Sequence, residues 1–155
     1  MASTPVGLRI LIVEDNPARV DQFRLWLNHP RIRLIHVRSG DGALRCLEER
    51  WDAILLDHDL LFEHPLGRER ARIDGRGVVR RLIERGVNRQ TPCIIHSMNP
   101  GGRNAMYQLL RANRHDVLIK PFDDWSEKWA HDLRAELLET LDDPLHPAGP
   151  PSAAP

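Results

Sequence analysis

Residues 53–60 have the sequence Ala-Ile-Leu-Leu-Asp-His-Asp-Leu, so four apolar side chains run directly into three titratable ones. An uninterrupted apolar run of this length is typical of a strand that is buried on both faces, as in a parallel sheet. In an open α/β sheet, the loops after such strands face a common crevice where ligands bind. A single aspartate there would be explained best as a solvated surface acid. Asp57, His58 and Asp59 in direct succession favour a functional site.

Four other short apolar runs have the composition of strands. They lie at residues 8–13, 34–37, 93–95 and 117–119, and with residues 53–56 they make five predicted strands. Apolar residues at helical spacing follow each strand and predict a helix there. Five strands alternating with five helices predict the α/β class, with one doubly wound parallel sheet in the flavodoxin-like order 2-1-3-4-5.

Residues that favour helix ends mark the boundaries of the predicted helices. Asn16 and Ser39 are typical N-caps of the first two helices, and Gly86 is typical of the C-terminal end of the third. Asp124 and Glu127 form a capping-box pattern for the last helix. The domain is therefore predicted to span residues 8–141.

Two segments do not fit regular structure. Residues 61–76 have no apolar period and contain proline, glycine and many charges, so we expect a long loop, which in a compact domain is usually functional or mobile. Residues 142–155 are rich in Pro, Ala, Gly and Ser and cannot bury much apolar surface, so we expect a disordered tail.

The overall composition excludes several classes of protein. Of the 155 residues, 22 are Lys or Arg and 22 are Asp or Glu, so no global charge favours nucleic acid or an anionic membrane. No apolar run approaches the roughly 20 residues that span a bilayer, and the first residues lack the pattern of a signal peptide. Cys46 and Cys93 lie in apolar surroundings and are expected to be buried free thiols. A cytoplasmic protein without membrane contact is predicted.

Polar residues follow four of the five predicted strands. Glu14 and Asp15 follow the first, Asp57 to Asp59 the third, His96 and Ser97 the fourth, and Lys120 the fifth. In the order 2-1-3-4-5 the switch point lies between the first and third strands, so the acids of both strands should meet there.

These residues resemble the receiver domain of response regulators. The resemblance extends from Leu8 to about Leu141 and rests on Glu14-Asp15, Asp57, Ser97 and Lys120-Pro121-Phe122. In that family the first acidic pair and the acceptor aspartate hold Mg²⁺, the acceptor takes a phosphoryl group, and the hydroxyl and lysine residues contact its oxygens. The resemblance implies that Asp15, Asp57 and the Asp59 carbonyl bind the metal with support from Glu14, and that Ser97 and Lys120 contact the phosphate.

Three departures from ordinary receivers narrow the resemblance. The acceptor is followed by His58-Asp59 and the long arginine-bearing loop, and the fourth strand leads into His96-Ser97-Met98-Asn99. Val117 replaces the aromatic residue that usually reports phosphorylation. These features resemble the receiver variant proposed to process cyclic phosphates, which is marked by Asp-His-Asp and His-Ser-x-Asn.

A cation is expected where the carboxylates converge, because they would otherwise repel one another strongly. Oxygen ligands favour Mg²⁺, with Mn²⁺ as an alternative metal. A cluster of acids with raised pKa values and no metal is the structural alternative. Zinc is less favoured, because His58, His64 and His96 match no closed zinc spacing.

The remaining site residues have a functional and a structural interpretation each. His58 and His96 could give or take a proton near neutral pH, or could be structural histidines bonded to carbonyl groups. Asn99 offers hydrogen bonds, and the N–H groups of Gly101 and Gly102 could hold an anion or belong to a simple turn.

The charges of the long loop leave its role open. Four arginines, Arg68, Arg70, Arg72 and Arg76, could grip a phosphate, a nucleotide or an RNA end. Acidic residues of the same loop dilute that charge, so a solvated loop is an equal alternative.

Three functions are compatible with the sequence. The first is a metal-dependent phosphoesterase that processes a cyclic phosphate, with Asp57, His58, His96 and Lys120 as its catalytic residues. The second is a single-domain receiver in a phosphorelay, with Asp57 as acceptor and a histidine kinase as partner. The third is a receiver fold used for interaction without chemistry. The added histidines favour the first, and the sequence predicts neither the substrate nor the oligomeric state.

Overall fold

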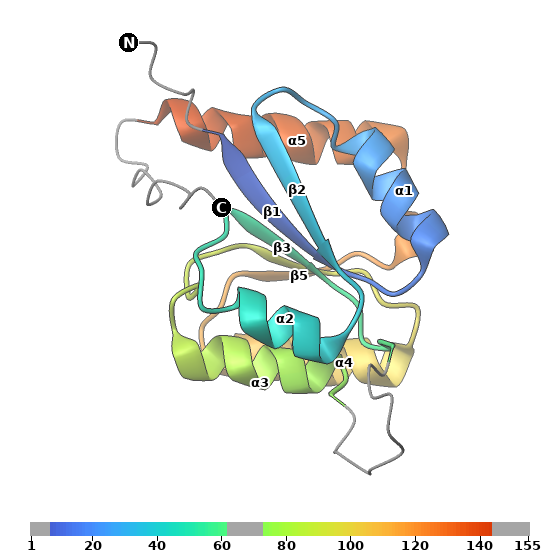
Figure 1. Ribbon diagram of the computed structural model, residues 1–155, viewed down its shortest axis with the longest axis vertical. Coiled ribbons are helices and arrows are strands. Elements are labelled where there is room, and N and C mark those ends of the chain that lie inside the picture. Colours follow the sequence, from blue (N-terminus) through green and yellow to red (C-terminus); the bar gives the residue numbers. More distant parts are fainter. Residues whose placement is uncertain (1–6, 62–72, 144–155) are drawn as a thin grey trace.

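The computed structural model describes residues 7–61 and 73–143 and contains one five-stranded parallel sheet (Figure 1). The strand order is β2-β1-β3-β4-β5, as predicted. The strands are β1 (Leu8–Val13), β2 (Ile32–Val37), β3 (Ala53–Leu56), β4 (Cys93–Ile95) and β5 (Val117–Ile119). Only β2 differs in length from its prediction. It begins two residues earlier because Ile32 and Arg33 pair in register with Leu8 and Arg9 of β1.

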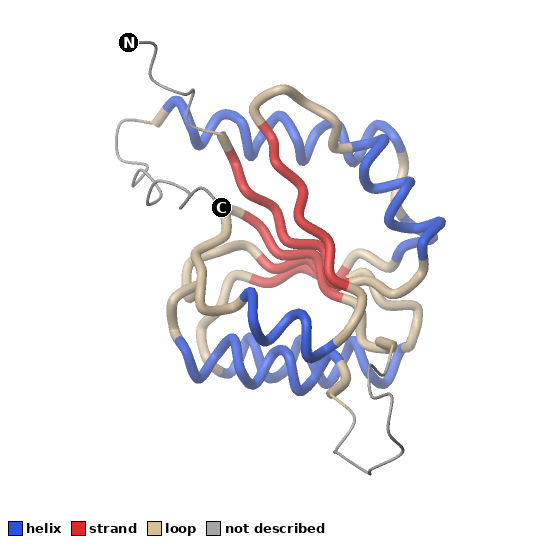
Figure 2. The backbone as a smooth tube through the Cα atoms, viewed as in Figure 1, coloured by secondary structure: helices blue, strands red, loops and turns tan. Residues whose placement is uncertain are grey.

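In the described part of the chain, five helices cover the two faces of the sheet. They are α1 (Pro17–Trp26), α2 (Gly40–Cys46), α3 (Gly75–Arg85), α4 (Pro100–Ala112) and α5 (Glu127–Asp142), with a 3₁₀ turn, η1 (Phe122–Asp124), before the last. Helices α1 and α5 lie on one face, and α2, α3 and α4 lie on the other (Figures 1 and 2). This is the doubly wound arrangement expected for parallel strands joined by helical crossovers.

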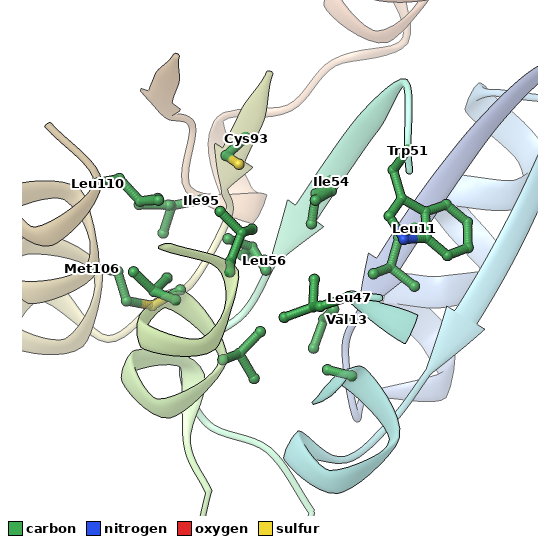
Figure 3. Close-up of a cluster of buried hydrophobic side chains, with 14 of the residues drawn as sticks. Leu11, Val13, Leu47, Trp51, Ile54, Leu56, Cys93, Ile95, Met106 and Leu110 are labelled. Atoms are coloured by element: carbon green, nitrogen blue, oxygen red, sulfur yellow. The ribbon is translucent and has the colours of Figure 1, made fainter. Parts of the chain in front are cut away.

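The central strand β3 explains why its apolar run is uninterrupted. All four of its residues are buried. Ile54 and Leu56 face the core under α2, α3 and α4, where they pack near Leu11, Ile95 and Met106 (Figure 3). Its other two residues, Ala53 and Leu55, face the second core, under α1 and α5. Because successive strand residues point to opposite faces, a strand covered on both sides needs apolar residues at every position.

Most of the predicted helix ends are confirmed. The Asn16 side chain accepts hydrogen bonds from the first turn of α1, and Ser39 Oγ accepts one from the Gly42 N–H in α2. Gly86 ends α3 with a φ of 68°, in the left-handed region that glycine tolerates best. The chain therefore enters and leaves these helices at residues whose chemistry favours those ends.

Two helix starts differ from the predictions. Helix α3 begins at Gly75 with Asp74 as its N-cap, so Gly75 and Arg76 belong to the helix and not to the predicted loop. Helix α5 is capped by Ser126, whose Oγ accepts from the Trp129 N–H, and not by Asp124. The capping box fails because Asp124 is held in the preceding 3₁₀ turn.

Parts of several predictions lie outside the described residues. These include residues 62–72 of the predicted loop, with His64, Arg68, Arg70 and Arg72, and the predicted tail apart from Asp142 in α5 and the C-cap Asp143. Cys93 is a buried free thiol, whereas the free thiol of Cys46 is only partly buried. No helix in the described segments is long and apolar enough to span a bilayer.

Candidate functional site

The carboxyl ends of β1 and β3 bring the predicted acids together, and the end of β4 lies beside them. Val13 pairs with Leu56, and Leu56 pairs with Ile95, so the residues that follow these three begin at the same edge of the sheet. Glu14, Asp15 and Asp57 each place a carboxylate oxygen within 4.8 Å of the other two. The acids that follow β1 and β3 therefore converge at the switch point of the sheet, as the sequence predicts.

An open cleft of about 440 Å³ lies against this cluster. It is lined by residues from the ends of β1 and β3 and the beginnings of α1 and α4, namely Asp15, Asn16, Arg19, Asp57, Asp59, Met98, Asn99 and Pro100. Among the described residues, its walls combine three carboxylates, two amides and one guanidinium group. Such a polar lining suits a small polar ligand.

Glu14 forms the buried floor of the cluster. Its Oε1 accepts a hydrogen bond from the Asn16 N–H at 2.8 Å, whereas its Oε2 has no hydrogen-bond partner among the described residues. Burial, together with the nearby Asp57 carboxylate, raises the pKa of Glu14 to about 7. A buried carboxylate oxygen without a partner is costly and needs a compensating positive charge or a proton.

Asp57 lies at the end of β3 and is almost fully buried. Its Oδ1 accepts a hydrogen bond from the His58 N–H at 2.8 Å. Burial raises the pKa of Asp57, and the nearby Asp15 adds to this, although hydrogen bonds from His58 and Ser97 act in the opposite direction. The raised pKa values of Glu14 and Asp57 indicate that ionising both of these buried acids is unfavourable without a nearby positive charge.

The donor set of the cluster fits a hard divalent cation. It consists of three carboxylates, and one of them has an oxygen without a hydrogen-bond partner among the described residues. Oxygen ligands of this kind suit Mg²⁺ or Mn²⁺ and do not favour zinc. His96 lies beside the cluster but faces Phe23, and His64 lies outside the described residues.

Arg19 is a site residue that the sequence analysis missed. Its Nη1 lies 3.6 Å from Glu14 Oε2 and 4.0 Å from Asp57 Oδ2. Its guanidinium group also lies over the Phe122 ring, 5.3 Å from the ring centroid. One arginine among many in the sequence carries no distinctive signal. Its position in the first turn of α1, directly after the acid-bearing end of β1, is the only indication that could have been used.

Lys120 occupies a different place from the one expected of it. Its backbone N–H extends the β4–β5 ladder, but its Nζ lies 5.0 Å from the centroid of the Trp129 ring. Among the described residues, those that line the cleft do not include Lys120. Among the described residues, the cation that lines the cleft is therefore Arg19.

The two predicted histidines have unlike surroundings. His96 is fully buried, its Nδ1 is 3.4 Å from Glu14 Oε2, and its ring packs edge-on against Phe23. Burial lowers the pKa of His96 to about 3, so its imidazole is neutral near pH 7. His58 keeps 12% of its side chain exposed and has its Nδ1 2.8 Å from Asp59 Oδ1. Of the two histidines, only His58 contacts a residue that lines the cleft, namely Asp59.

The predicted phosphate-binding residues begin helix α4. Ser97 is buried and its Oγ accepts from the Asn99 N–H at 3.1 Å. Asn99 caps the helix through Oδ1, which accepts from the Gly102 N–H at 3.0 Å, so this N–H is already used in the cap. Gly101 is exposed in the first turn. Of the predicted anion ligands, Asn99 lines the cleft.

The chain matches one family model. Residues 10–112 match the cyclic-phosphate processing receiver domain. The comparison with curated proteins finds no match.

Solved receiver domains share the fold. The receiver domain of the sensor histidine kinase PA1611 from Pseudomonas aeruginosa PAO1, which has a magnesium ion coordinated in its active site cleft, is 27% identical. The match covers 86% of this chain and 98% of that one, with a TM-score of 0.59. The phosphorylated cyanobacterial phytochrome response regulator RcpA is 21% identical over 88% of this chain and 95% of that one, with a TM-score of 0.61. A histidine kinase receiver domain from Syntrophus aciditrophicus is 24% identical, over 86% and 91% of the two chains, with a TM-score of 0.61.

Proposed function

The chain belongs to the family of cyclic-phosphate processing receiver domains, and we propose that its acidic cleft binds a divalent cation and hydrolyses a cyclic phosphate. One observation carries the proposal. Three carboxylates converge beside an open cleft, and a buried oxygen of Glu14 has no hydrogen-bond partner among the described residues. Cation binding would relieve this unfavourable arrangement and would prepare the cleft for a phosphate.

We infer that Mg²⁺ is the cation, with Mn²⁺ as an alternative. Asp15, Asp57 and the Asp59 carbonyl would hold it, with Glu14 below them. The bound cation would polarise the phosphoryl oxygens of the substrate. The magnesium ion in the cleft of the Pseudomonas receiver supports the choice of metal.

The residues of the chain itself supply the other requirements of the reaction. In hydrolysis, a water oxygen adds to phosphorus, one P–O ester bond of the ring breaks, and the proton released by the water ends on the alcohol oxygen. Arg19 at the cleft would offset the negative charge of the phosphoryl oxygens. The His58–Asp59 pair is the better candidate for handling the proton, because Asp59 lines the cleft whereas His96 is enclosed.

A neighbouring cavity supports an RNA end or a nucleotide as the substrate. It has a volume of about 260 Å³ and its lining includes His36, Arg38 and Arg45 but no acid. His36 Nε2 lies 2.7 Å from the Glu14 carbonyl oxygen, so this cavity is close to the acidic cluster. Arginine side chains favour phosphate groups. A substrate with a second phosphate would therefore suit the two cavities together.

The test is a hydrolysis assay on purified protein. We expect turnover of 2′,3′-cyclic nucleotides or of RNA with a cyclic phosphate end in the presence of Mg²⁺, and loss of turnover with EDTA or in Asp57→Asn. If neither substrate class is changed by the Mg²⁺-loaded protein, the proposal is wrong.

A phosphoacceptor receiver is the second candidate. The position of Asp57 at the end of β3, beside Asp15 and Ser97, favours it. Acetyl phosphate should then add one phosphoryl group that intact-mass analysis detects and that Asp57→Asn does not accept. A histidine kinase would be the partner of such a protein, in the cytoplasm. If calorimetry finds no binding of Mg²⁺ or Mn²⁺, both candidates fail and an interaction module without chemistry is favoured.

A further inference from the structure

His58 lies in a cradle made by two glycines from different helices. A Cβ atom on Gly75, at the start of α3, would lie 2.5 Å from the Asp57 carbonyl oxygen and 2.6 Å from His58 Cα. A Cβ atom on Gly102, at the start of α4, would lie 2.6 Å from His58 Nδ1. The Gly75 N–H also donates to the His58 carbonyl oxygen at 2.8 Å. The two helix starts are therefore shaped around this histidine.

Both nitrogens of the His58 imidazole face a carboxylate. Nδ1 lies 2.8 Å from Asp59 Oδ1, at hydrogen-bond distance, whereas Nε2 lies 3.4 Å from Asp74 Oδ2, at ion-pair distance and without the geometry of a hydrogen bond among the described residues. The histidine thus connects Asp74, which lies at the start of α3, with Asp59, which lines the cleft. An imidazole that bonds one carboxylate is commonly held in its orientation by a second group on the other nitrogen.

Asp59 is the residue of this chain of contacts that lines the cleft. Its side chain is 61% exposed and lines the cleft beside Asp57. Besides the contact with His58, Asp59 Oδ1 accepts a hydrogen bond from Asn99 Nδ2 at 3.3 Å. Two neighbouring elements therefore position its carboxylate.

Asp74 uses its two oxygens for different purposes. Oδ1 caps α3 by accepting from the Gly77 N–H at 3.1 Å, and Oδ2 contacts His58 and Arg76. Burial raises the pKa of Asp74, but the hydrogen bonds from Gly77 and Arg76 outweigh it, so the pKa is below its usual value. Asp74 is thus a carboxylate that can accept a proton-bearing nitrogen.

We propose that Asp74 is a positioning residue of the cleft, which holds His58 by Nε2 so that Nδ1 fixes the Asp59 carboxylate where substrate binds. The inference rests on the proposed function and deepens it. It gives the Asp59 side chain, and not only its carbonyl group, contact with the substrate. His58 then acts through Asp59.

Two substitutions of Asp74 separate positioning from helix capping. Asp74→Ser keeps a good N-cap but is too short to contact His58. Asp74→Asn keeps the cap through Oδ1 and places an amide NH₂ group against His58. That group would make Nε2 an acceptor and leave the proton on Nδ1, so the bond to Asp59 would be kept. Arg76→Ala removes the other partner of Asp74 Oδ2 and is the matched control.

The first measurement is nitrogen-edited NMR of the His58 ring in the full chain, with EDTA present. In the wild type and in Arg76→Ala we expect slowly exchanging ring N–H protons at Nδ1 and Nε2, because the carboxylates that face the two nitrogens can only accept. In Asp74→Asn we expect the proton on Nδ1 alone, and in Asp74→Ser rapid exchange at both nitrogens. A ring signal in Asp74→Ser identical to that of the wild type would overturn the proposal.

The second measurement is turnover of a 2′,3′-cyclic nucleotide with Mg²⁺. Because groups that orient a ligand contribute about 10- to 100-fold, we expect kcat of Asp74→Ser to fall at least about tenfold with KM unchanged, whereas Asp74→Asn stays within about threefold of the wild type. A fall in Asp74→Asn equal to that in Asp74→Ser would show that charge matters and not position, and would overturn the inference. If the wild type has no turnover, the proposed function fails, and the ring signals still decide whether Asp74 holds His58.

Discussion

Replacing Glu14 with glutamine should stabilise the metal-free protein at alkaline pH. Glutamine keeps the Oε1 that accepts from the Asn16 N–H, and its amide group replaces the oxygen that has no hydrogen-bond partner among the described residues. Because burial raises the pKa of Glu14 from 4.5 to about 7, the folded state binds this proton more tightly than the unfolded state. The contribution of Glu14 to stability is therefore complete below about pH 4.5 and is lost as pH rises through about 7.

The size of the effect follows from the shift in pKa. At about 1.4 kcal/mol per pKa unit, the shift of Glu14 corresponds to roughly 2 to 3 kcal/mol of stability lost between pH 5 and pH 8. The measurement is urea unfolding in the presence of EDTA. We compare the free energy of unfolding of Glu14→Gln with that of the wild type at each pH. The advantage of Glu14→Gln should be larger at pH 8 than at pH 5 by this amount. Excess Mg²⁺ should reduce the difference in stability between Glu14→Gln and the wild type at pH 8. Mg²⁺ that binds only the folded state stabilises the wild type.

A carboxylate on the surface provides the control. Asp21 lies on α1 with 75% of its side chain exposed, so Asp21→Asn should give the same difference from the wild type at both pH values. The reasoning would be refuted if Glu14→Gln were less stable than the wild type at pH 8 in EDTA. It would also be refuted if the difference between the two proteins did not change with pH.

Three further predictions concern packing and charge. Gly102→Ala should lower the free energy of unfolding by about 1–3 kcal/mol, because the new Cβ would clash with the His58 ring. The control, Gly101→Ala, should be neutral or stabilising. Equal losses of the two variants in urea unfolding would contradict this prediction. Gly86→Ala should cost about 1 kcal/mol, because the residue has a φ of 68°, and an unchanged thermal midpoint would argue against it. Arg19→Met should destabilise the protein at pH 8 in EDTA by about 1 kcal/mol, because it removes the cation beside the buried acids. The loss of stability should be smaller in excess Mg²⁺. A loss of the same size in Mg²⁺ and in EDTA would show that Arg19 acts by packing alone.

The sequence was sufficient for the fold and for the convergence of the acids. In a doubly wound parallel sheet, residues that directly follow the buried strands must meet at one edge, whatever the detailed packing of the helices. Apolar runs and cap residues such as Asn16 and Gly86 are local signals, and the structure confirms them. The sequence also carried the family resemblance, which the match over residues 10–112 confirms.

Side-chain partners that belong to separate elements required the tertiary structure. Asp74 meets His58 only because α3 docks against the end of β3, and no local pattern encodes that contact. The sequence treated Lys120 as the cation of the site, but helix packing places Arg19 in the cleft and Lys120 over Trp129.

The difference between the two histidines has the same origin. Both follow buried strands and have the same intrinsic pKa. His96 is enclosed against Phe23, and its pKa falls to about 3, whereas His58 sits at the edge of the cleft between two carboxylates. Sequence determines which groups reach the edge of the sheet, because strand register is local and regular. Only packing decides which of them are enclosed and which lie at the cleft, because burial depends on neighbours far along the chain.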